Sequence, residues 1–388
     1  MVDDILTVTD AGVKAIKMNA AVQSKIDVKK LELGKTKCFQ MNIGAKNDVI
    51  NPTLKIHDEE MSKSNREKYL GDILTSDCKI DETVRGRQTK GIGIVNQIMS
   101  ILKEISFGPY FFEMAFLLRS SMLLNGMLFS SEALIGMTEK HILMLEDCDL
   151  MLMRKIFQAQ VGTPKESFYL ESAVLPIRFV IIGRRLMFLW SILHKDDSEL
   201  VKKVYKAQKL FPQKGNWASV VKDDLEFCDI KLTDEKIQNT KKNKFKGIVK
   251  KSIRVKSNNF LLDLQAIHSK SKHLEISDDI PDYLTSEELS LSEKKLLFKL
   301  RSRMVEIKEN FKRKYKENLL CSFCGIKDET AVHLLECKVL LKDLNLDEHL
   351  KDTKVDDIFK DVSKQAKSVR VWRKILDKMS DELNKEKS

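Results

Sequence analysis

The sequence predicts a mainly α-helical protein, with a small α+β region at its N-terminus and a small Cys/His knuckle followed by a helix near its C-terminus. Three observations indicate this fold class. Apolar residues recur at helical spacing through most of the 388 residues. Only 6 prolines and 15 glycines interrupt them, and three of the seven cysteines are clustered. We therefore expect long helices, few linkers and one local metal site.

The composition is that of a globular chain with a basic surface. Hydrophobic residues make up 43% and charged residues 32%, and the length suits two or three domains. The net charge of +11 predicts a polyanionic partner, with nucleic acid ahead of a membrane. Cysteines without a signal peptide predict an intracellular protein, in the nucleus, the cytoplasm or both. Cys38, Cys78, Cys148 and Cys228 are expected to be buried apolar residues.

The first acidic residues are two adjacent aspartates, Asp3 and Asp4, which lie between Val2 and Ile5. Apolar residues on both sides predict a short buried strand with the acidic pair at a turn. Paired carboxylates of this kind suit Mg²⁺ held against substrate phosphates. The alternative is a solvated polar turn without a ligand.

The next seventy residues predict a helix over 13–26, a basic turn that leads into a strand near Phe39, and a strand over 67–74. Together with the acidic pair, this order resembles the end of the palm in reverse transcriptases of non-LTR (LINE-like) retrotransposons. The resemblance implies a metal-binding acidic box at Asp3 and Asp4. It also implies nucleic-acid contacts in the lysine-bearing loop and in the strand that grips the primer end, namely Lys35, Lys37, Tyr69 and Gly71.

The resemblance extends along the whole chain. It assigns 1–80 to a partial palm, 81–210 to a helical thumb-like domain, 211–316 to a basic helical linker domain, 317–345 to a zinc knuckle and 346–388 to a helical tail. Members of the family place their fingers and the first half of the palm before the acidic box, and that half supplies a third metal-binding carboxylate. We therefore expect a truncated polymerase that binds RNA or primer–template duplex but does not polymerise alone, unless a partner supplies the missing half of the palm.

Two alternatives remain open at this stage. One is a full reverse transcriptase whose coding sequence starts further upstream. The other is a non-catalytic, zinc-containing nucleic-acid-binding adaptor, in which the acidic pair has no role. A primer-extension assay with Mg²⁺ separates the enzymatic from the non-enzymatic alternatives.

Helices are expected over 81–102, over the apolar stretch 109–130, after Thr138, after Pro164 and over 173–194. The stretch 109–130 contains Glu113, Arg119 and Asn125, which favours a buried helix over a membrane span. A thumb holds duplex by its phosphate backbone, so basic residues of these helices are candidate contacts. They are Arg85, Arg87, Lys90, Arg178, Arg184 and Arg185, with an ordinary solvated helix face as the alternative.

Beyond a predicted linker at 211–217, the basic residues become concentrated. Residues 241–256 contain eight basic residues and no acidic one, and residues 294–316 contain ten basic residues against two glutamates. Ser292 is the expected N-cap of a helix in the second segment. These segments predict binding of RNA, RNA–DNA hybrid or single-stranded DNA, with no membrane partner. The candidate contacts here are Lys250, Lys251, Arg301, Arg303 and Arg313.

The clustered cysteines and a histidine have the spacing C-x2-C-x8-H-x3-C, at Cys321, Cys324, His333 and Cys337. Two thiolates from a tight turn, with an imidazole and a thiolate one helical turn apart, can converge on Zn²⁺. Four protein ligands leave no position for water, so the zinc is expected to be structural. The alternative is a set of reduced cysteines in a small core. LINE-like proteins also carry a Cys/His knuckle near the C-terminus, and an amphipathic helix over 362–383 is expected to follow it here.

Overall fold

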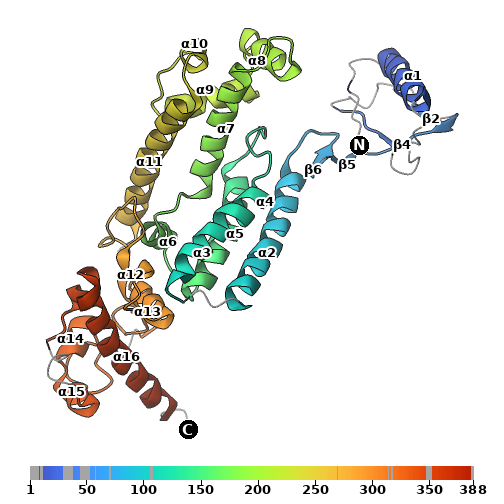
Figure 1. The fold of residues 1–388 in the computed structure, drawn as a ribbon. Helices are drawn as coiled ribbons and strands as arrows, with labels where there is room; N and C mark the ends of the chain where they lie inside the picture. The colour runs from blue at the N-terminus through green and yellow to red at the C-terminus, as the bar shows by residue number, and fades with distance from the viewer. Residues whose placement is uncertain are drawn as a thin grey trace. The chain divides into compact units, whose positions relative to one another are not determined.

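The computed structural model is mainly helical, as the sequence predicts (Figure 1). It describes residues 8, 12–28, 38–43, 53–56, 58–69, 71–104, 108–268, 270–312, 314–315, 318–346 and 352–385. The chain divides into two compact units, one from residues 1–90 and 136–144 and the other from residues 91–135 and 145–388. Each unit is described by itself.

The first unit contains α1 (Gly12–Val28) and short strands. Among the described residues the strands form three two-stranded sheets. They are parallel β1 (Phe39–Gln40) with β4 (Ser62–Lys63), antiparallel β2 (Lys55–Ile56) with β3 (Glu59–Glu60), and the hairpin of β5 (Arg66–Tyr69) with β6 (Asp72–Thr75). The predicted strand over 67–74 is therefore a hairpin. Gly71 has φ +94° beside the Tyr69–Asp72 pair, so this glycine serves a tight turn.

The start of α2 (Asp81–Glu104) is fixed to this hairpin by the hydroxyl of Thr83. The Thr83 Oγ1 accepts a hydrogen bond from the Ile73 backbone N–H at 3.1 Å and donates one to the Ile73 carbonyl at 2.9 Å. One buried side chain thus joins the two elements where the chain passes from strand to helix.

The apolar stretch 109–130 forms short helices of the second unit, with one side buried at Phe112, Leu123 and Met127 and the other exposed at Leu117 and Phe129. It comprises η2 (Gly108–Tyr110), α3 (Phe111–Leu118), a π-helical turn η3 (Arg119–Leu124) and α4 (Asn125–Met127). Arg119 lies inside the unit because its guanidinium donates two hydrogen bonds, at 2.6 and 2.7 Å, to Asp149. Among the described residues, no helix has the length and apolar character needed to cross a bilayer.

Four phenylalanines form the centre of the core beside these helices. Phe157 ends α5 (Glu139–Phe157), and its ring stacks on Phe298 with centroids 4.1 Å apart. Phe112 and Phe168 pack against the same pair, at 4.9 and 5.3 Å between nearest centroids. Phe168 belongs to α6 (Lys165–Ser172). The core therefore joins helices that are more than a hundred residues apart in sequence.

A second core lies between α7 (Ile177–Leu193) and α11 (Lys242–Ile267), which run side by side (Figure 1). Three shorter helices complete this region: α8 (Leu200–Leu210), α9 (Trp217–Phe227) and α10 (Asp234–Gln238). Trp217, at the end of the predicted linker, is buried in this core. The loop at 211–217 therefore connects parts of one packed body.

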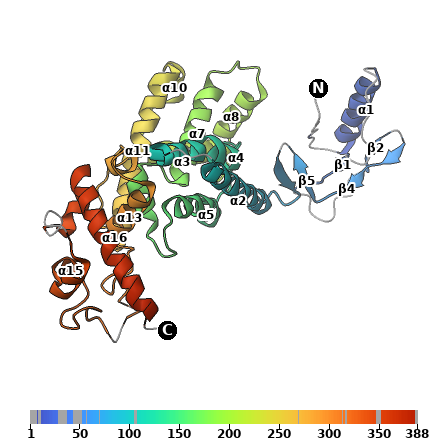
Figure 2. The ribbon, with the colours of Figure 1, turned by 60° about the horizontal axis from the view of Figure 1, so that its bottom comes forward.

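The C-terminal helices are α12 (Asp282–Thr285), α13 (Leu291–Arg301), α14 (Ala331–Glu336), α15 (Lys338–Leu344) and α16 (Val362–Lys385), with a 3-10 turn η5 (Val355–Phe359) before the last. Figure 2 shows α16 alongside α13. Ser290, and not Ser292, caps α13, and Glu293 closes the capping box. Of the four cysteines predicted to be buried, Cys148 and Cys228 are, whereas Cys78 is exposed and Cys38 is half-buried.

Candidate metal centre and basic surface

Cys321, Cys324, His333 and Cys337 lie together, with their ligand atoms all within 4.8 Å of one another. The Sγ of Cys324 is 3.2 Å from the Nε2 of His333. Cys321 and Cys337 are buried, whereas Cys324 and His333 are half-buried. The four residues predicted from their spacing therefore form one group that could hold a metal ion.

The first two cysteines lie on a tight loop whose backbone N–H groups favour thiolates. Gly325 adopts φ +62° and donates its N–H to the Cys321 carbonyl at 2.9 Å. Hydrogen bonds from the backbone N–H groups of Ile326 and Lys327 lower the pKa of Cys324 to about 6. Burial raises the pKa of Cys321 to about 11, although two backbone N–H groups of the loop oppose the rise. A metal ion binds cysteines as thiolates. The loop itself favours the thiolate of Cys324, whereas Cys321 needs the positive charge of the metal to lose its proton.

The other two ligands are held by α14. Thr330 caps this helix, and its hydroxyl accepts a hydrogen bond from the His333 N–H at 3.0 Å. Cys337 follows the last residue of α14, one turn after His333, so both side chains face the loop. Leu334 and Leu335, which lie between the two ligands in sequence, are buried. The helix thus contributes both to the metal site and to the core.

Glu329, which is not among the residues predicted from the sequence, connects the metal loop with the segment before it. Its side chain is almost fully buried and accepts hydrogen bonds from the Ser322 N–H at 3.1 Å, the Ser322 hydroxyl at 2.7 Å and the Lys308 N–H at 3.1 Å. The only sequence signal is its place next to the capping Thr330. Such a residue orients the loop that carries two ligands.

Four protein side chains around one point leave no coordination position open for a substrate or water. Three sulfur atoms and one imidazole nitrogen form a soft donor set, which is compatible with a structural zinc ion. The arrangement therefore suits a stabilising metal ion.

The predicted catalytic and nucleic-acid-binding residues, apart from Tyr69 and Gly71, fall into three groups. Asp3, Asp4, Lys35, Lys37 and Arg313 lie outside the described residues. A second group is exposed, and it consists of Arg85, Lys90, Lys250, Lys251 and Arg303. Tyr69 is half-buried in β5, next to Gly71 of the turn.

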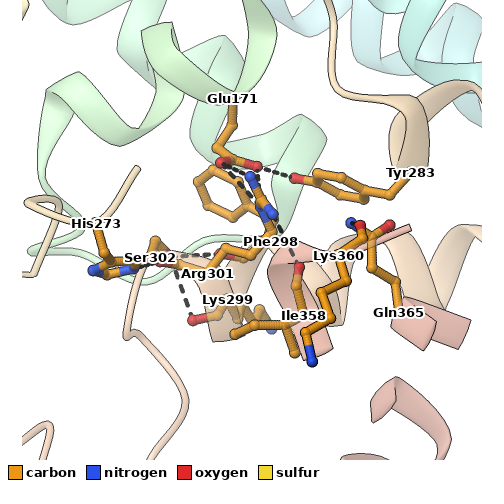
Figure 3. A network of polar contacts seen from close by, with 10 residues as sticks. All are labelled: Glu171, His273, Tyr283, Phe298, Lys299, Arg301, Ser302, Ile358, Lys360 and Gln365. Atoms are coloured by element: carbon orange, nitrogen blue, oxygen red, sulfur yellow. Dashed lines mark hydrogen bonds and ion pairs between the residues drawn. The ribbon is translucent and has the colours of Figure 1, made fainter. Parts of the chain in front are cut away.

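The third group comprises arginines whose guanidinium groups already have protein acceptors. Arg87 binds Asp72 at 2.8 Å, and Arg178 binds Glu146 at 3.0 Å. Arg184 donates to the Leu128 carbonyl at 2.6 Å, Arg185 lies 2.7 Å from Asp224, and Arg301 is bound to Glu171 (Figure 3). Each of these five guanidinium groups therefore has a carboxylate or carbonyl partner inside the fold, which makes it less available to a phosphate than an exposed lysine.

Helix α11 presents lysines to solvent on the face opposite its core contacts. Phe245, Val249 and Ile253 are buried in the core that α11 shares with α7. Four lysine side chains are exposed and make no hydrogen bond, ion pair or cation–π contact with any described residue, namely those of Lys244, Lys246, Lys250 and Lys251. Further along the helix, Arg254 pairs with Asp278 and Lys256 with Asp229. The uncompensated charge is therefore concentrated in the first half of α11.

No protein-family model, curated protein or solved structure matches this chain. Its function is therefore inferred from the metal centre and from the basic face of α11.

Proposed function

We propose that this chain is a zinc-stabilised nucleic-acid-binding protein that takes RNA, RNA–DNA hybrid or single-stranded DNA on the basic face of α11. The observation that carries the proposal is the set of four exposed lysines without partners in the described structure, Lys244, Lys246, Lys250 and Lys251. Each ammonium group is a donor with no acceptor function, so an anionic partner is favoured. Phosphate contacts of this kind release counterions and account for most sequence-independent affinity.

Zinc is the metal that fits the Cys3His group best in this proposal. Thiolate and imidazole ligands in tetrahedral sets are typical of structural zinc. Cys321, Cys324, His333 and Cys337 would hold the ion, and Glu329 would orient the loop between them. In such small regions the metal supplies much of the folding free energy. The bound ion would thus order residues 318–346 beside the helical body.

The resemblance to LINE-like reverse transcriptases gives this proposal a context. On that basis the basic helix and the knuckle belong to the part that follows the palm and holds template and primer. Asp3 and Asp4 would then form part of a Mg²⁺ site that also needs the first half of the palm. A non-catalytic adaptor uses the same basic face and metal centre without that chemistry, and primer extension on an RNA template distinguishes the two.

Fluorescence anisotropy with labelled single-stranded RNA, RNA–DNA hybrid and single-stranded DNA of one sequence tests the proposal. We expect the logarithm of the binding constant to fall linearly with the logarithm of salt concentration, by about 0.7–0.9 for each phosphate contact. The double variant Lys250→Glu/Lys251→Glu should bind more weakly and with a smaller slope. Lys203→Glu/Lys222→Glu changes the net charge equally on exposed sites of α8 and α9, and should bind nearly as the wild type does. Binding that does not depend on salt, or two double variants that are equally impaired, would contradict the proposal.

A further inference from the structure

Gly247 lies in the interior of α11, where glycine is less favourable than any residue except proline. Packing explains some helical glycines of this protein. A Cβ at Gly183 would lie 3.0 Å from the Cδ1 of Ile253, and one at Gly91 would lie 2.9 Å from the Sδ of Met127. At Gly247 an added Cβ would meet nothing within 4 Å apart from its chain neighbours and the nearby backbone of its own helix, and the backbone there is helical. Neither packing nor backbone conformation within the described structure requires this glycine.

The residues around Gly247 on the helix surface are those three and four positions away in each direction. They are Asn243, Lys244, Lys250 and Lys251, and we call them the Gly247 ring. All four are exposed. The ring therefore presents three ammonium groups and one amide around a stretch of helix backbone that no side chain covers.

We propose that Gly247 is the point at which the sugar–phosphate backbone of the bound nucleic acid lies against α11. This inference rests on the proposed function and deepens it, since it names the part of the ligand that is bound and the position of the contact. A side chain at residue 247 would hold a strand away from the helix without changing any charge. The ring contains no apolar side chain and offers mainly donors, which suits phosphate oxygens and not the face of a base.

A contact of this kind carries no sequence information, because phosphates and sugars are the same at every position. We therefore expect RNAs of unrelated sequence to bind with similar affinity. An acidic protein surface would also attract the three lysines. In that case poly-glutamate should displace labelled RNA as effectively, charge for charge, as unlabelled RNA does, and this result would overturn the inference.

The variants Gly247→Ala and Gly247→Leu test the inference in the full-length protein. Alanine should raise the midpoint of thermal unfolding, because it favours the helix and meets open space. Both variants should nevertheless bind RNA more weakly, with leucine the weaker. Leucine should also reduce the salt slope by about 0.7–0.9, the value of one phosphate contact. Gly93→Ala in α2 is the matched control, since Gly93 is exposed and has open space at its Cβ position. The residues three and four positions from Gly93 are Thr89, Lys90, Asn96 and Gln97, so they include one lysine where the Gly247 ring has three. Gly93→Ala should raise the midpoint of thermal unfolding without changing the affinity for RNA.

The outcomes separate this inference from the proposed function. Gly247→Ala and Gly247→Leu could bind RNA with wild-type affinity and salt slope while Lys250→Glu/Lys251→Glu binds more weakly. In that case the contact at Gly247 is wrong, and the proposal that nucleic acid binds the basic face of α11 is retained. If the wild type shows no salt-dependent binding, both are wrong. A loss of affinity in Gly247→Ala cannot be attributed to unfolding when its thermal midpoint is raised.

Discussion

Arg301 of α13 and Glu171 of α6 form a buried ion pair across 130 residues of sequence. The Arg301 Nε lies 3.0 and 2.9 Å from the two carboxylate oxygens, and Nη2 lies 3.0 Å from Oε1 (Figure 3). The Tyr283 hydroxyl donates to the same carboxylate at 2.6 Å, and the Arg301 Nη1 donates to the Ile358 carbonyl at 2.9 Å. The Arg301 guanidinium thus joins α13 with α6 and η5, and the Glu171 carboxylate adds α12, so this pair fixes the C-terminal helices to the rest of the unit.

Removing one member of this pair should destabilise the protein strongly. Glu171→Ala leaves the buried guanidinium of Arg301 without its counter-charge, so we expect the free energy of unfolding to fall by about 3–5 kcal/mol. The double variant Glu171→Leu/Arg301→Met should recover most of this loss, because neither charge is then buried alone. Urea unfolding followed by circular dichroism measures both.

An exposed ion pair of the same protein is the control. Lys195 and Glu199 are 2.7 Å apart on the surface, with about two-fifths of each side chain exposed. Glu199→Ala should change the free energy of unfolding by less than about 1 kcal/mol. Equal effects of Glu171→Ala and Glu199→Ala would show that the buried pair does not hold the C-terminal helices in place.

The sequence could predict helices whose core contacts repeat locally. The helical spacing places Ile92, Val95, Ile98, Met99 and Leu102 at core positions of α2. Val95, Ile98 and Leu102 are buried, Met99 is half-buried and Ile92 is exposed. Val369 and Trp372 of α16 are buried in the same way. The partner of Arg301 could not be predicted, because Arg301 stands in a segment with nine other basic residues and its acceptor lies 130 residues away.

The metal centre, like α2, could be predicted because the residues that form it are close together in the sequence. Its four ligands fall within seventeen consecutive residues, so their spacing alone determines that they can converge. Glu329 contacts Ser322 and Lys308 through the folded chain, and no spacing rule indicates it. For Gly71 the sequence predicted that the backbone approaches a bound nucleic acid. In the described hairpin this glycine forms the turn between β5 and β6.

Asp224 should make stability depend on pH between about 4 and about 6. Burial raises the pKa of this carboxyl group from 3.8 to about 6, although Arg185 lies 2.7 Å away and favours the ionised form. Within this window the folded protein holds a proton that the unfolded chain has lost. The contribution of Asp224 to stability is therefore full below about pH 4 and is lost as the pH rises to about 6.

Asp224→Asn should flatten this dependence, because an amide does not titrate. The comparison is between the pH profiles of unfolding, since the variant also removes the charge opposite Arg185 and is less stable at neutral pH. Glu226→Gln, at an exposed site on the same helix, should retain the wild-type profile. A profile of Asp224→Asn that follows the wild type from pH 4 to 6 would show that Asp224 is ionised throughout.

Two glycines in α2 should respond to alanine in opposite ways. A Cβ at Gly91 would lie 2.9 Å from the Met127 Sδ and 3.2 Å from the Cys148 Sγ, so Gly91→Ala should lower the free energy of unfolding by about 1–3 kcal/mol. At Gly93 an added Cβ meets open space, and Gly93→Ala should raise the free energy of unfolding by about 0.5–1 kcal/mol. Chemical denaturation of both variants checks the prediction. Equal shifts in one direction would mean that α2 does not approach Met127 and Cys148 as closely as described.

Loss of one metal ligand should disorder the knuckle and leave the helical body folded. We expect the purified protein to contain about one zinc ion per chain, and Cys324→Ser to contain much less, because the serine hydroxyl is a poor ligand. Metal analysis measures the content, and hydrogen exchange should then show faster exchange across 318–346, whose ligand loop has few packed residues of its own. Cys78→Ser is the matched control, since Cys78 is an exposed cysteine outside the Cys3His group, and it should keep both the zinc and the protection. If Cys324→Ser retained its zinc, three ligands would suffice and the fourth position would be free for chemistry, which would make the centre a candidate catalytic site.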